Sequence, residues 1–301
     1  MKVISLFDGM SCARIALDRA KIPVTEYYSS EIDKYAIQVS QANYPDIIQL
    51  GDVQDISFKE GEIDLLIGGS PCQGFSFAGR QLNFDDPRSK LFFEYVRILK
   101  ESKPKYFLLE NVRMKKDYQD VISDLLGVQP IAINSSLVSA QNRYRLYWTN
   151  IPGVLPPEDK RILMRDILEQ EPKEFTTMSD KFVTRNSCDS ITGRPNLTDN
   201  FNGLLLIGYA EQIKGHGYNR RVYHPGGKAP SLCAASGGNL EPKVSLSEKK
   251  YRKLTPLECE RLQTVPDNYT AHVSNTQRYK MLGNGFTVDV IAHILKGINH
   301  L

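Results

Sequence analysis

The sequence is poor in the residues that would build a disulfide scaffold or a zinc site. It has five cysteines and five histidines among 301 residues, and no two cysteines form a C-x-x-C pair. The cysteine count is odd, the cysteines lie far apart, and the histidines lack metal-ligand spacing. We therefore expect no disulfide framework, no metal, and a reducing, cytoplasmic setting in which most thiols are ordinary buried side chains.

Long apolar runs and a strong excess of one charge are also missing. No run approaches the roughly 18 apolar residues of a membrane span, and the strand-like run Lys2–Phe7 leaves no room for a signal peptide. The 38 basic and 35 acidic residues give a net charge of +3, which argues neither for nor against nucleic acid. Because 41% of the residues are hydrophobic, the composition predicts a globular chain and excludes a disordered one.

The first half alternates short apolar runs with segments of helical spacing. The runs that predict strands are Lys2–Phe7, Thr25–Ser30, Ile47–Leu50, Ile63–Gly68, Lys105–Leu109, Ile131–Val138 and Tyr144–Trp148. The segments that predict helices are Cys12–Ala20, with Ser11 as a candidate cap, Leu91–Lys100 and Asp117–Leu126. This alternation predicts an α/β fold with a mostly parallel, Rossmann-like sheet covered on both faces. The last two strands are close enough to pair with each other.

The pattern changes at a proline cluster, residues 152–157, which is followed by a short predicted helix over Lys160–Glu169. Residues 176–252 are loop-like, hold nine of the 21 glycines, and carry 11 basic against 6 acidic residues. The near-neutral total therefore conceals a basic, glycine-rich segment, which is either a solvated surface insertion or a nucleic-acid contact. Helical spacing returns in Thr255–Gln263 and Phe286–Ile298.

Polar residues stand where the predicted strands end, the edge at which doubly wound sheets bind ligands. Glu31 follows Gly9 by about 20 residues, the place of a carboxylate that binds the ribose hydroxyls of a nucleoside cofactor. The turn over residues 7–11 has one glycine where a dinucleotide fingerprint needs three. A nucleoside cofactor without phosphates, such as S-adenosylmethionine, therefore fits better than NAD.

Cys72 lies in a Pro-Cys-Gln-Gly turn directly after a predicted buried strand. Its thiolate is a strong nucleophile, although the turn by itself favours an ordinary buried cysteine. Glu110 ends the next strand and should lie near the thiol. Gln141, Arg143 and Arg145 have the period-two spacing that places side chains on one face of a strand, where they are either a basic site or a solvated face.

Together these motifs resemble the DNA (cytosine-5)-methyltransferases of the bacterial and phage type. The matching segments are Phe7-Asp8-Gly9, Pro71-Cys72-Gln73-Gly74-Phe75-Ser76, Glu110-Asn111-Val112, Gln141-Asn142-Arg143-Tyr144-Arg145, Arg252-Lys253-Leu254-Thr255-Pro256 with Glu258-Cys259, and Gly283-Asn284-Gly285-Phe286 with Val288. Their order and spacing also fit, although the family usually has glycines where Ser11 and Cys12 stand. The resemblance implies a catalytic and cofactor-binding domain over residues 1–172, a small target-recognition domain over 173–252, and a C-terminal return over 253–301.

The resemblance also implies the reaction and its residues. Cys72 would add to C6 of a cytosine flipped out of the helix, so that C5 can attack the methyl group of S-adenosylmethionine. Glu110 in its protonated form would donate to N3 and Arg143 to O2, with Gln141 and Arg145 in the same motif. The residues implied to bind the cofactor are Phe7, Asp8, Gly9, Met10, Ser11, Glu31, Ile32, Asp52, Val53, Pro71, Leu91, Asn284, Gly285 and Phe286.

Double-stranded DNA is the implied partner, and a monomer is the expected state. The candidate DNA contacts are Gln73, Ser76, Arg80, Arg88, Lys214, Arg220, Arg221, Lys228 and Lys243. Two alternatives remain. One is the same chemistry on tRNA, although the Cys-Phe-Thr signature of that branch is missing here. The other is a catalytically silent DNA-binding homologue, against which the four residues Cys72, Glu110, Arg143 and Arg145 argue.

Overall fold

A computed structural model describes residues 1–70, 87–170, 176–177, 203–210, 213, 217–234, 239–247 and 250–300. The chain forms two compact units. The first comprises Met1–Asn134, Tyr144–Pro157 and Val288–Leu301, and the second comprises Ser135–Arg143 and Glu158–Thr287. This division differs from the expected boundaries after residues 172 and 252. The chain enters the second unit at Ser135, returns to the first at Tyr144, and crosses again at Glu158 and Val288.

The first unit is built on a seven-stranded sheet with the order β3-β2-β1-β4-β5-β8-β6. Its strands are β1 (Lys2–Leu6), β2 (Glu26–Ser30), β3 (Ile48–Gln49), β4 (Leu65–Gly68), β5 (Tyr106–Val112), β6 (Ile131–Asn134) and β8 (Tyr144–Thr149). The first five strands in this order are parallel, whereas β8 is antiparallel to both β5 and β6. The predicted α/β fold and the predicted pairing of the last two strands are confirmed.

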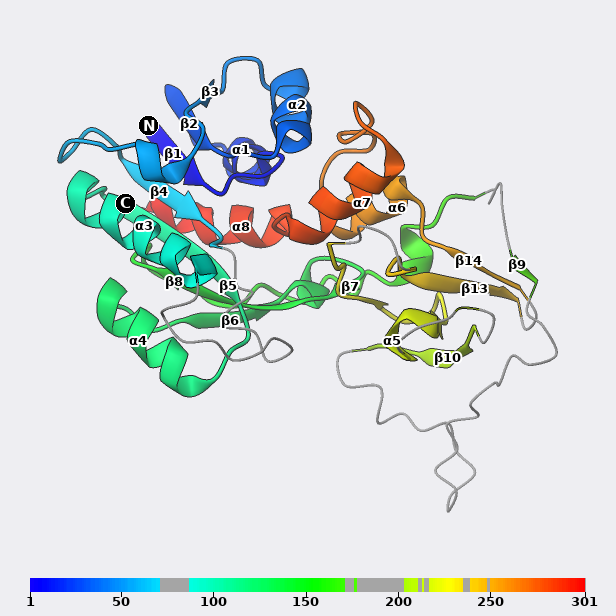
Figure 1. Ribbon diagram of the computed structural model, residues 1–301. Helices are drawn as coiled ribbons and strands as arrows, with labels where there is room; N and C mark the ends of the chain where they lie inside the picture. Colours follow the sequence, from blue (N-terminus) through cyan, green and yellow to red (C-terminus); the bar gives the residue numbers. More distant parts are fainter. Residues whose placement is uncertain are drawn as a thin grey trace. The chain divides into compact units, whose positions relative to one another are not determined.

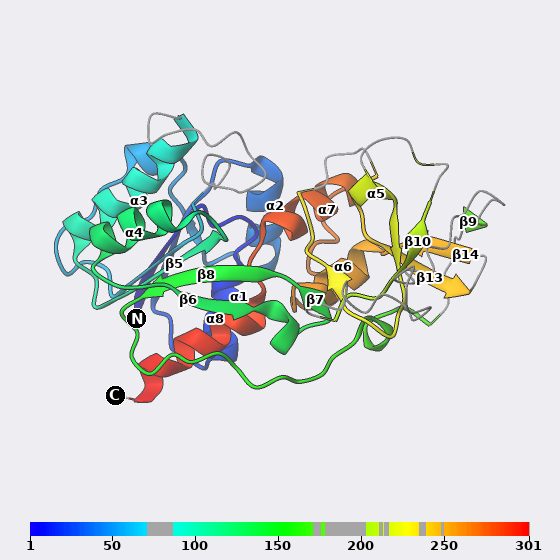
Figure 2. The same ribbon diagram turned by 90° about the horizontal axis from the view of Figure 1, so that it is seen from below.

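Helices cover both faces of this sheet. They are α1 (Cys12–Arg19), α2 (Lys34–Asn43), α3 (Pro87–Ser102), α4 (Lys116–Leu126) and α8 (Val288–Leu295), with the 3-10 helices η1 (Val53–Asp55) and η5 (Lys296–His300). Figure 2 shows α3 and α4 on one face and α1 and α8 on the other. Phe92 and Tyr95 of α3 and Ile122 of α4 pack with Leu109 and Trp148 of the sheet in one buried cluster.

The C-terminal helix α8 packs beside α1, as Figure 1 shows for the red and blue ends of the chain. An ion pair joins the two helices, with Arg19 Nη1 2.6 Å from Asp289 Oδ1. Residues about 270 positions apart in the sequence thus complete one layer of the first unit. Sequence periodicity predicted both of these helices but missed α2.

The second unit contains more regular structure than the loop-like pattern predicted. Its five-stranded sheet has the order β10-β11-β13-β14-β9, and a further pair joins β12 to β7. The strands are β7 (Gln141–Asn142), β9 (Thr176–Thr177), β10 (Leu206–Tyr209), β11 (Arg221–Tyr223), β12 (Ala229–Pro230), β13 (Lys243–Ser247) and β14 (Lys250–Lys253). The expectation of loops across residues 176–252 is therefore wrong for the described part, because short strands without long apolar runs leave little periodicity to detect.

The helices of the second unit are short. They are η2 (Ser135–Leu137), η3 (Met164–Asp166), α5 (Gly217–Arg220), α6 (Pro256–Leu262) and α7 (Asn275–Asn284). The helix expected over Lys160–Glu169 shrinks to η3, whereas α6 is confirmed. Thr255 caps α6, its side chain accepting from Glu258 N while the Glu258 carboxylate accepts from Thr255 N, as in a capping box.

Candidate active site

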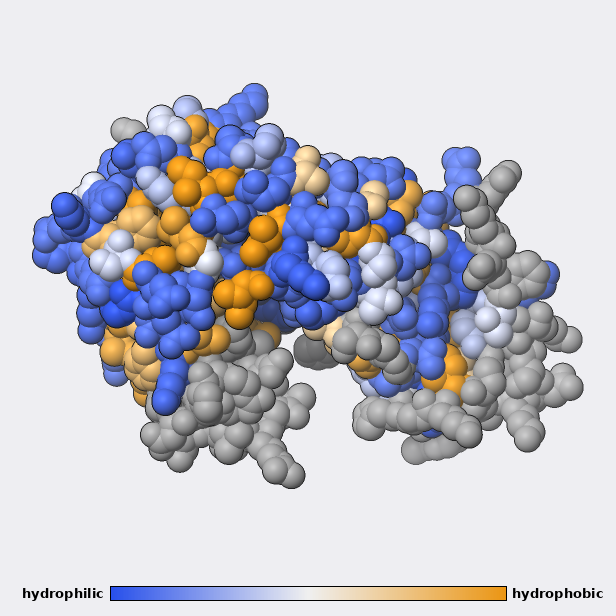
Figure 3. Space-filling view, turned by 45° about the horizontal axis from the view of Figure 1, so that its top comes forward, coloured by the Kyte–Doolittle hydropathy of each residue, from blue (hydrophilic) through white to orange (hydrophobic). Residues whose placement is uncertain are grey.

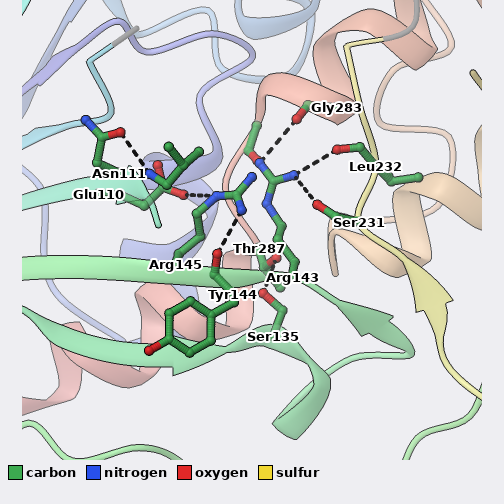
Figure 4. Close-up of polar contacts among 12 residues, drawn as sticks. Glu110, Asn111, Ser135, Arg143, Tyr144, Arg145, Ser231, Leu232, Gly283 and Thr287 are labelled. Atoms are coloured by element: carbon green, nitrogen blue, oxygen red, sulfur yellow. Dashed lines mark hydrogen bonds and ion pairs between the residues drawn. The ribbon is translucent and has the colours of Figure 1, made fainter. Parts of the chain in front are cut away.

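The acid of the candidate site sits on β5 in the first unit. Glu110 is largely shielded from solvent, with 12% of its side chain exposed, and its Oε1 lies 3.0 Å from Arg145 Nε. Arg145 lies on the neighbouring strand β8, where its Nη1 also donates to Tyr144 O at 2.8 Å (Figure 4). The residue next to Glu110, Asn111, is buried and donates from Nδ2 to Ser70 Oγ at 3.3 Å. The carboxyl ends of β4 and β5 are thus joined beside the acid.

The expectation that Gln141, Arg143 and Arg145 lie on one continuous strand is wrong. The strand pairing is interrupted at Arg143, so that β7 ends at Asn142 and β8 begins at Tyr144. The physical reason is a change of partner: β7 pairs with β12, whereas β8 pairs with β5 and β6, and Arg143 O accepts from Ser135 N between them. Gln141 and Arg143 belong to the second unit and Arg145 to the first.

The guanidinium of Arg143 is hydrogen-bonded within the protein. Nη1 donates to Leu232 O at 3.1 Å and Ser231 Oγ at 3.4 Å, and Nη2 donates to Gly283 O at 3.2 Å and Gly285 O at 3.1 Å (Figure 4). The residue is 4% exposed. These contacts occupy the four terminal N–H groups of Arg143, and its expected role at cytosine O2 stays a prediction.

Gln141 is buried in a network of amides that the sequence did not indicate. Its Nε2 donates to Leu262 O at 3.1 Å and Gln263 Oε1 at 3.2 Å, while its Oε1 accepts from Leu232 N at 2.8 Å. Thr287 Oγ1 donates to the same Gln263 oxygen. These contacts make Gln141 part of the internal packing of the second unit. Gln263 was not predicted from the sequence, because a glutamine at the end of a helix does not by itself indicate a buried hydrogen-bond network.

The turn between β1 and α1 uses most of its side chains internally. Asp8, Met10 and Ser11 are all buried, and only Phe7 and Gly9 are partly exposed. Asp8 accepts from Ser11 Oγ at 2.6 Å and from Tyr27 OH at 2.7 Å. Burial raises the pKa of the Asp8 carboxyl, and the hydroxyl donors oppose that shift. Three of the five expected cofactor residues in the turn can thus offer a ligand only their backbone.

Ser11 does not cap α1 as predicted. It adopts a left-handed conformation with φ of 61°, and its hydroxyl contacts Asp8 and Ser40 instead of a backbone N–H of the helix. The hydroxyl is drawn to the buried carboxylate, which is the stronger acceptor.

Glu31 is held in place by three backbone donors. Gly9 N donates to Oε2, and Ile32 N and Asp33 N donate to Oε1, each at 2.8 Å. A carboxylate has about four lone-pair sites, so Oε2 retains the capacity to accept from one further group, such as a ribose hydroxyl. Ile32 beside it is 74% exposed, the largest exposed fraction among the large hydrophobic residues described. Figure 3 shows other apolar residues scattered among hydrophilic ones on the visible surface. Glu31, with an oxygen that can still accept, and the exposed Ile32 therefore fit the ribose and base of a nucleoside.

The other expected cofactor residues fall in two groups. In the first unit, Asp52 Oδ1 accepts from Gln54 N at the start of η1, Val53 is buried, and Leu91 of α3 packs against the core cluster. In the second unit, Asn284 is exposed at the end of α7 and is followed by Gly285 and the buried Phe286.

Several expected residues lie outside the described part of the chain, among them the candidate nucleophile. These are Pro71, Cys72, Gln73, Ser76, Arg80 and Lys214. Arg88 lies in the first turn of α3, but its side chain is not described.

Two lysines expected at DNA are buried instead. Lys228 Nζ donates to Ser136 O and Ile162 O, each at 2.6 Å, and to Ser139 O at 3.0 Å. Lys243 is 1% exposed, and its Nζ donates to three backbone oxygens, those of residues 219, 239 and 241. Burial lowers the pKa of both, that of Lys243 to about 8. The expected DNA contacts of Lys228 and Lys243 are therefore corrected, because each ammonium group is buried and hydrogen-bonded to three backbone oxygens.

Arg220 and Arg221 are only partly buried. The guanidinium carbon of Arg221 lies 5.4 Å from the centre of the Tyr218 ring. Among the described residues, no helix is long and apolar enough to cross a membrane, and no cluster of His, Cys, Asp and Glu is arranged to hold a metal ion.

Comparison with known proteins gives a consistent family assignment. The model of the C-5 cytosine-specific DNA methylases matches residues 1–125 and 132–300. The type II methyltransferase M1.ScrFI of Lactococcus lactis subsp. cremoris is 32% identical across 96% of this chain and 76% of its own length. M.HhaI of Haemophilus parahaemolyticus is 29% identical across 99% of this chain and 94% of its own. The solved structure of the Entamoeba histolytica methyltransferase EhMeth superposes with a TM-score of 0.75 at 16% identity, covering 100% of this chain and 98% of that one.

Proposed function

The chain belongs to the C-5 cytosine-specific DNA methylases, and from that premise we propose the course of its reaction. The enzyme transfers a methyl group from S-adenosylmethionine to C5 of a cytosine that is flipped out of a specific, short duplex sequence. Cys72 forms a transient covalent bond to C6 during the transfer. The observation that carries this proposal is the shielded Glu110–Arg145 pair, at the end of the strand that follows the Cys72 turn.

Each step has a residue suited to it. Cytosine C5 is a poor nucleophile, and addition of the Cys72 thiolate at C6 converts the ring into an enamine whose C5 can attack. Negative charge moves toward N3 and O2, where protonated Glu110 and Arg145 donate. When bound, S-adenosylmethionine supplies the electrophilic methyl group. Loss of the C5 proton to solvent and of the Cys72 sulfur then restores the aromatic ring and leaves 5-methylcytosine in the DNA, with S-adenosylhomocysteine as the second product.

The O2 contact is assigned to Arg145 because of its donors. Arginine carries five N–H groups, of which Arg145 directs one to Glu110 and one to Tyr144 O within the described part of the chain. The remaining groups are sufficient for a base oxygen. The contact of Arg145 Nε with Glu110 Oε1, 3.0 Å apart, holds both side chains. With the proton of Glu110 on its other oxygen, the two residues can donate to adjacent atoms of the same base edge.

The cofactor is proposed to lie along the ends of β1, β2 and β3. The held carboxylate of Glu31 accepts from the ribose, and the exposed Ile32 side chain covers the adenine. Asp52 and Val53 bracket the adenine edge, Phe7 and the backbone of residues 8–11 line the site, and Leu91 contacts the methionine part. The cofactor role of Asn284, a residue of the second unit, stays a prediction. Glu31 Oε2 can accept one further hydrogen bond, and this supports the placement of the ribose.

DNA contacts are proposed for the remaining basic and polar candidates. In the second unit these are Arg220 and Arg221, and outside the described residues Gln73, Ser76, Arg80 and Lys214, with Arg88 at the start of α3. Because phosphate contacts release counterions, binding should weaken steeply as salt rises. A response to salt that is flat between 50 and 200 mM (about the range in which such contacts matter) would remove these residues from the interface.

The decisive experiment measures transfer of a labelled methyl group to mixed-sequence duplex DNA and, in parallel, to tRNA. Incorporation into DNA, located by sequencing for 5-methylcytosine, supports the proposal. Incorporation into tRNA alone would establish the RNA alternative, and incorporation into neither, with cofactor bound, would leave a silent homologue. Duplex containing 5-fluorocytosine should trap a covalent complex, because C5 carries fluorine and has no proton to lose after the transfer. The Cys72→Ser variant should form no such complex. A trapped complex that survives in Cys72→Ser would identify another nucleophile.

A further inference from the structure

A buried carboxylate lies in the turn between β1 and α1. Asp8 is 5% exposed, and its two oxygens accept from hydroxyl groups of two different elements. Oδ2 accepts from Ser11 Oγ at 2.6 Å, next to the start of α1, and Oδ1 accepts from Tyr27 OH at 2.7 Å, on β2. One side chain therefore ties the turn both to the helix that follows it and to the neighbouring strand.

The backbone of this turn needs such support. Phe7, Gly9 and Ser11 all have positive φ angles, of 56°, 59° and 61°, and only glycine adopts such angles without a steric cost. Strained residues persist where the surrounding structure over-determines their conformation. Asp8 lies between the first two of these residues, and its side-chain contacts hold the turn in this shape.

The same turn also contacts the end of β2, directly before and at Glu31. Asp8 N donates to Ser30 O at 3.2 Å, and Gly9 N donates to Glu31 Oε2 at 2.8 Å. Glu31 Oε1 accepts from the backbone N–H groups of the next two residues in the chain. Gly9 N is thus the contact from a distant segment that orients Oε2, the oxygen that can still accept from a ribose hydroxyl.

We propose that Asp8 is a positioning residue for ribose recognition, which fixes the turn over residues 7–11 and, through Gly9 N, orients Glu31 Oε2. This inference rests on the proposed function, in which Glu31 accepts from the ribose of S-adenosylmethionine. The Asp8 side chain is buried and acts through the turn, not by touching the cofactor. Residues 8, 9, 27 and 31, which carry the argument, all belong to the first unit.

Asparagine at position 8 tests this role with little change of shape. It keeps one acceptor oxygen and replaces the other with an NH2 group, which is a donor. The Asp8→Asn variant should therefore loosen the turn and let Glu31 Oε2 take other orientations. Asp18→Asn is the matched control, because Asp18 Oδ2 also accepts from a tyrosine hydroxyl of the first unit, Tyr44 OH at 2.8 Å, but lies outside the turn.

The experiment measures, by calorimetry, the dissociation constants of S-adenosylhomocysteine and of its 2′,3′-dideoxy analogue, which lacks both ribose hydroxyls. Wild-type protein should bind the analogue about 10- to 100-fold more weakly, because a hydrogen bond to a charged group is lost. Asp8→Asn should reduce this ratio by about threefold or more, while its dissociation constant for the analogue changes by less than about threefold. Asp18→Asn should keep the wild-type ratio.

The ratio separates a positioning role from a merely structural one. If Asp8→Asn weakens both ligands by the same factor, or weakens neither, the ratio stays unchanged and the inference is refuted while the proposed function stands. Wild-type protein that binds neither ligand, or binds both equally well, would overturn the proposed cofactor site and the inference with it. If Asp8→Asn does not fold, as judged by circular dichroism, Tyr27→Phe takes its place, because it removes the donor to Asp8 Oδ1 and keeps the ring. An unchanged ratio in that variant would likewise refute the inference.

Discussion

Removing the guanidinium of Arg252 should strongly destabilise the second unit. Glu258 is fully buried, and Arg252 Nη1 and Nη2 donate to its two carboxylate oxygens at 2.6 Å each. Thr255 N and Glu169 N also donate to this carboxylate, at 2.8 and 2.9 Å. In Arg252→Met these two amides remain, but the negative charge loses its counterion in a dry environment. Leaving such a charge unpaired costs about 3–5 kcal/mol.

Urea unfolding measures this cost. With a urea dependence of about 2 kcal/mol per molar, the loss corresponds to a fall of about 2 M in the unfolding midpoint. The chain has one tryptophan, the buried Trp148 of the first unit, so fluorescence follows that unit while far-ultraviolet circular dichroism also includes the second. In Arg252→Met the midpoint of the circular dichroism transition should fall to a lower urea concentration. The midpoint of the Trp148 fluorescence transition should not lie below it.

The double variant Arg252→Met/Glu258→Gln is the control, because glutamine keeps a side-chain oxygen that can accept from the backbone amides. Because it removes both charges together, it should recover most of the lost stability. If Arg252→Met unfolds at the wild-type midpoint, the pair contributes nothing and the reasoning is wrong. A double variant as unstable as the single one would show that the guanidinium acts through packing and not through its charge.

Three further predictions concern single sites. Glu31→Gln exchanges one acceptor oxygen for a donor amide and should weaken S-adenosylhomocysteine binding about tenfold by calorimetry, with an unchanged affinity arguing against the ribose contact. Burial lowers the pKa of Lys243 to about 8, so between pH 8 and the unfolded value near 10.5 the unfolded chain binds more protons and stability should rise with pH; Lys243→Met should lack this rise in urea titrations at pH 7.5 and 9.5. Gly68→Ala places a Cβ 2.9 Å from the Tyr95 ring and 3.3 Å from Leu6 O, which should cost the first unit about 1–3 kcal/mol in the Trp148 fluorescence transition.

The sequence predicted the first unit well because its strands are buried on both faces and its helices are amphipathic. Apolar runs such as Ile63–Gly68 are interrupted only at turns, so their ends indicate where each strand stops. The second unit gave a weaker signal. Its strands are two to five residues long, and its buried positions include charged residues such as Lys243 and Glu260, which a hydrophobicity pattern reads as surface. Glu260 is satisfied by the backbone of Asn268 and Thr270 and by Arg278, partners that no local pattern reveals.

Charge counting failed for a related reason. Residues 176–252 carry an excess of basic residues, and that excess predicted DNA contacts throughout the segment. Yet Lys228 and Lys243 each place the ammonium among three backbone carbonyls. Short strands and turns leave many carbonyls without ladder partners, and a buried lysine can satisfy several at once. Part of the positive charge of such a segment therefore holds its own backbone together and is not available to a phosphate.

Arg143 and Arg145 show how far residue type alone can support a site. Both stand in one motif, two positions apart, and alternation assigned them to one strand face and one task. The strand pairing stops between them, and their acceptors then differ: backbone carbonyls for Arg143 and the Glu110 carboxylate for Arg145. A guanidinium whose four terminal N–H groups are taken by three backbone carbonyls and one serine hydroxyl can hold those segments but has none of the four left for a substrate. One that is paired to an acid through a single nitrogen keeps donors for a base. The proposed role of Arg145 therefore rests on the N–H groups that remain to it, and their number depends on partners distant in sequence.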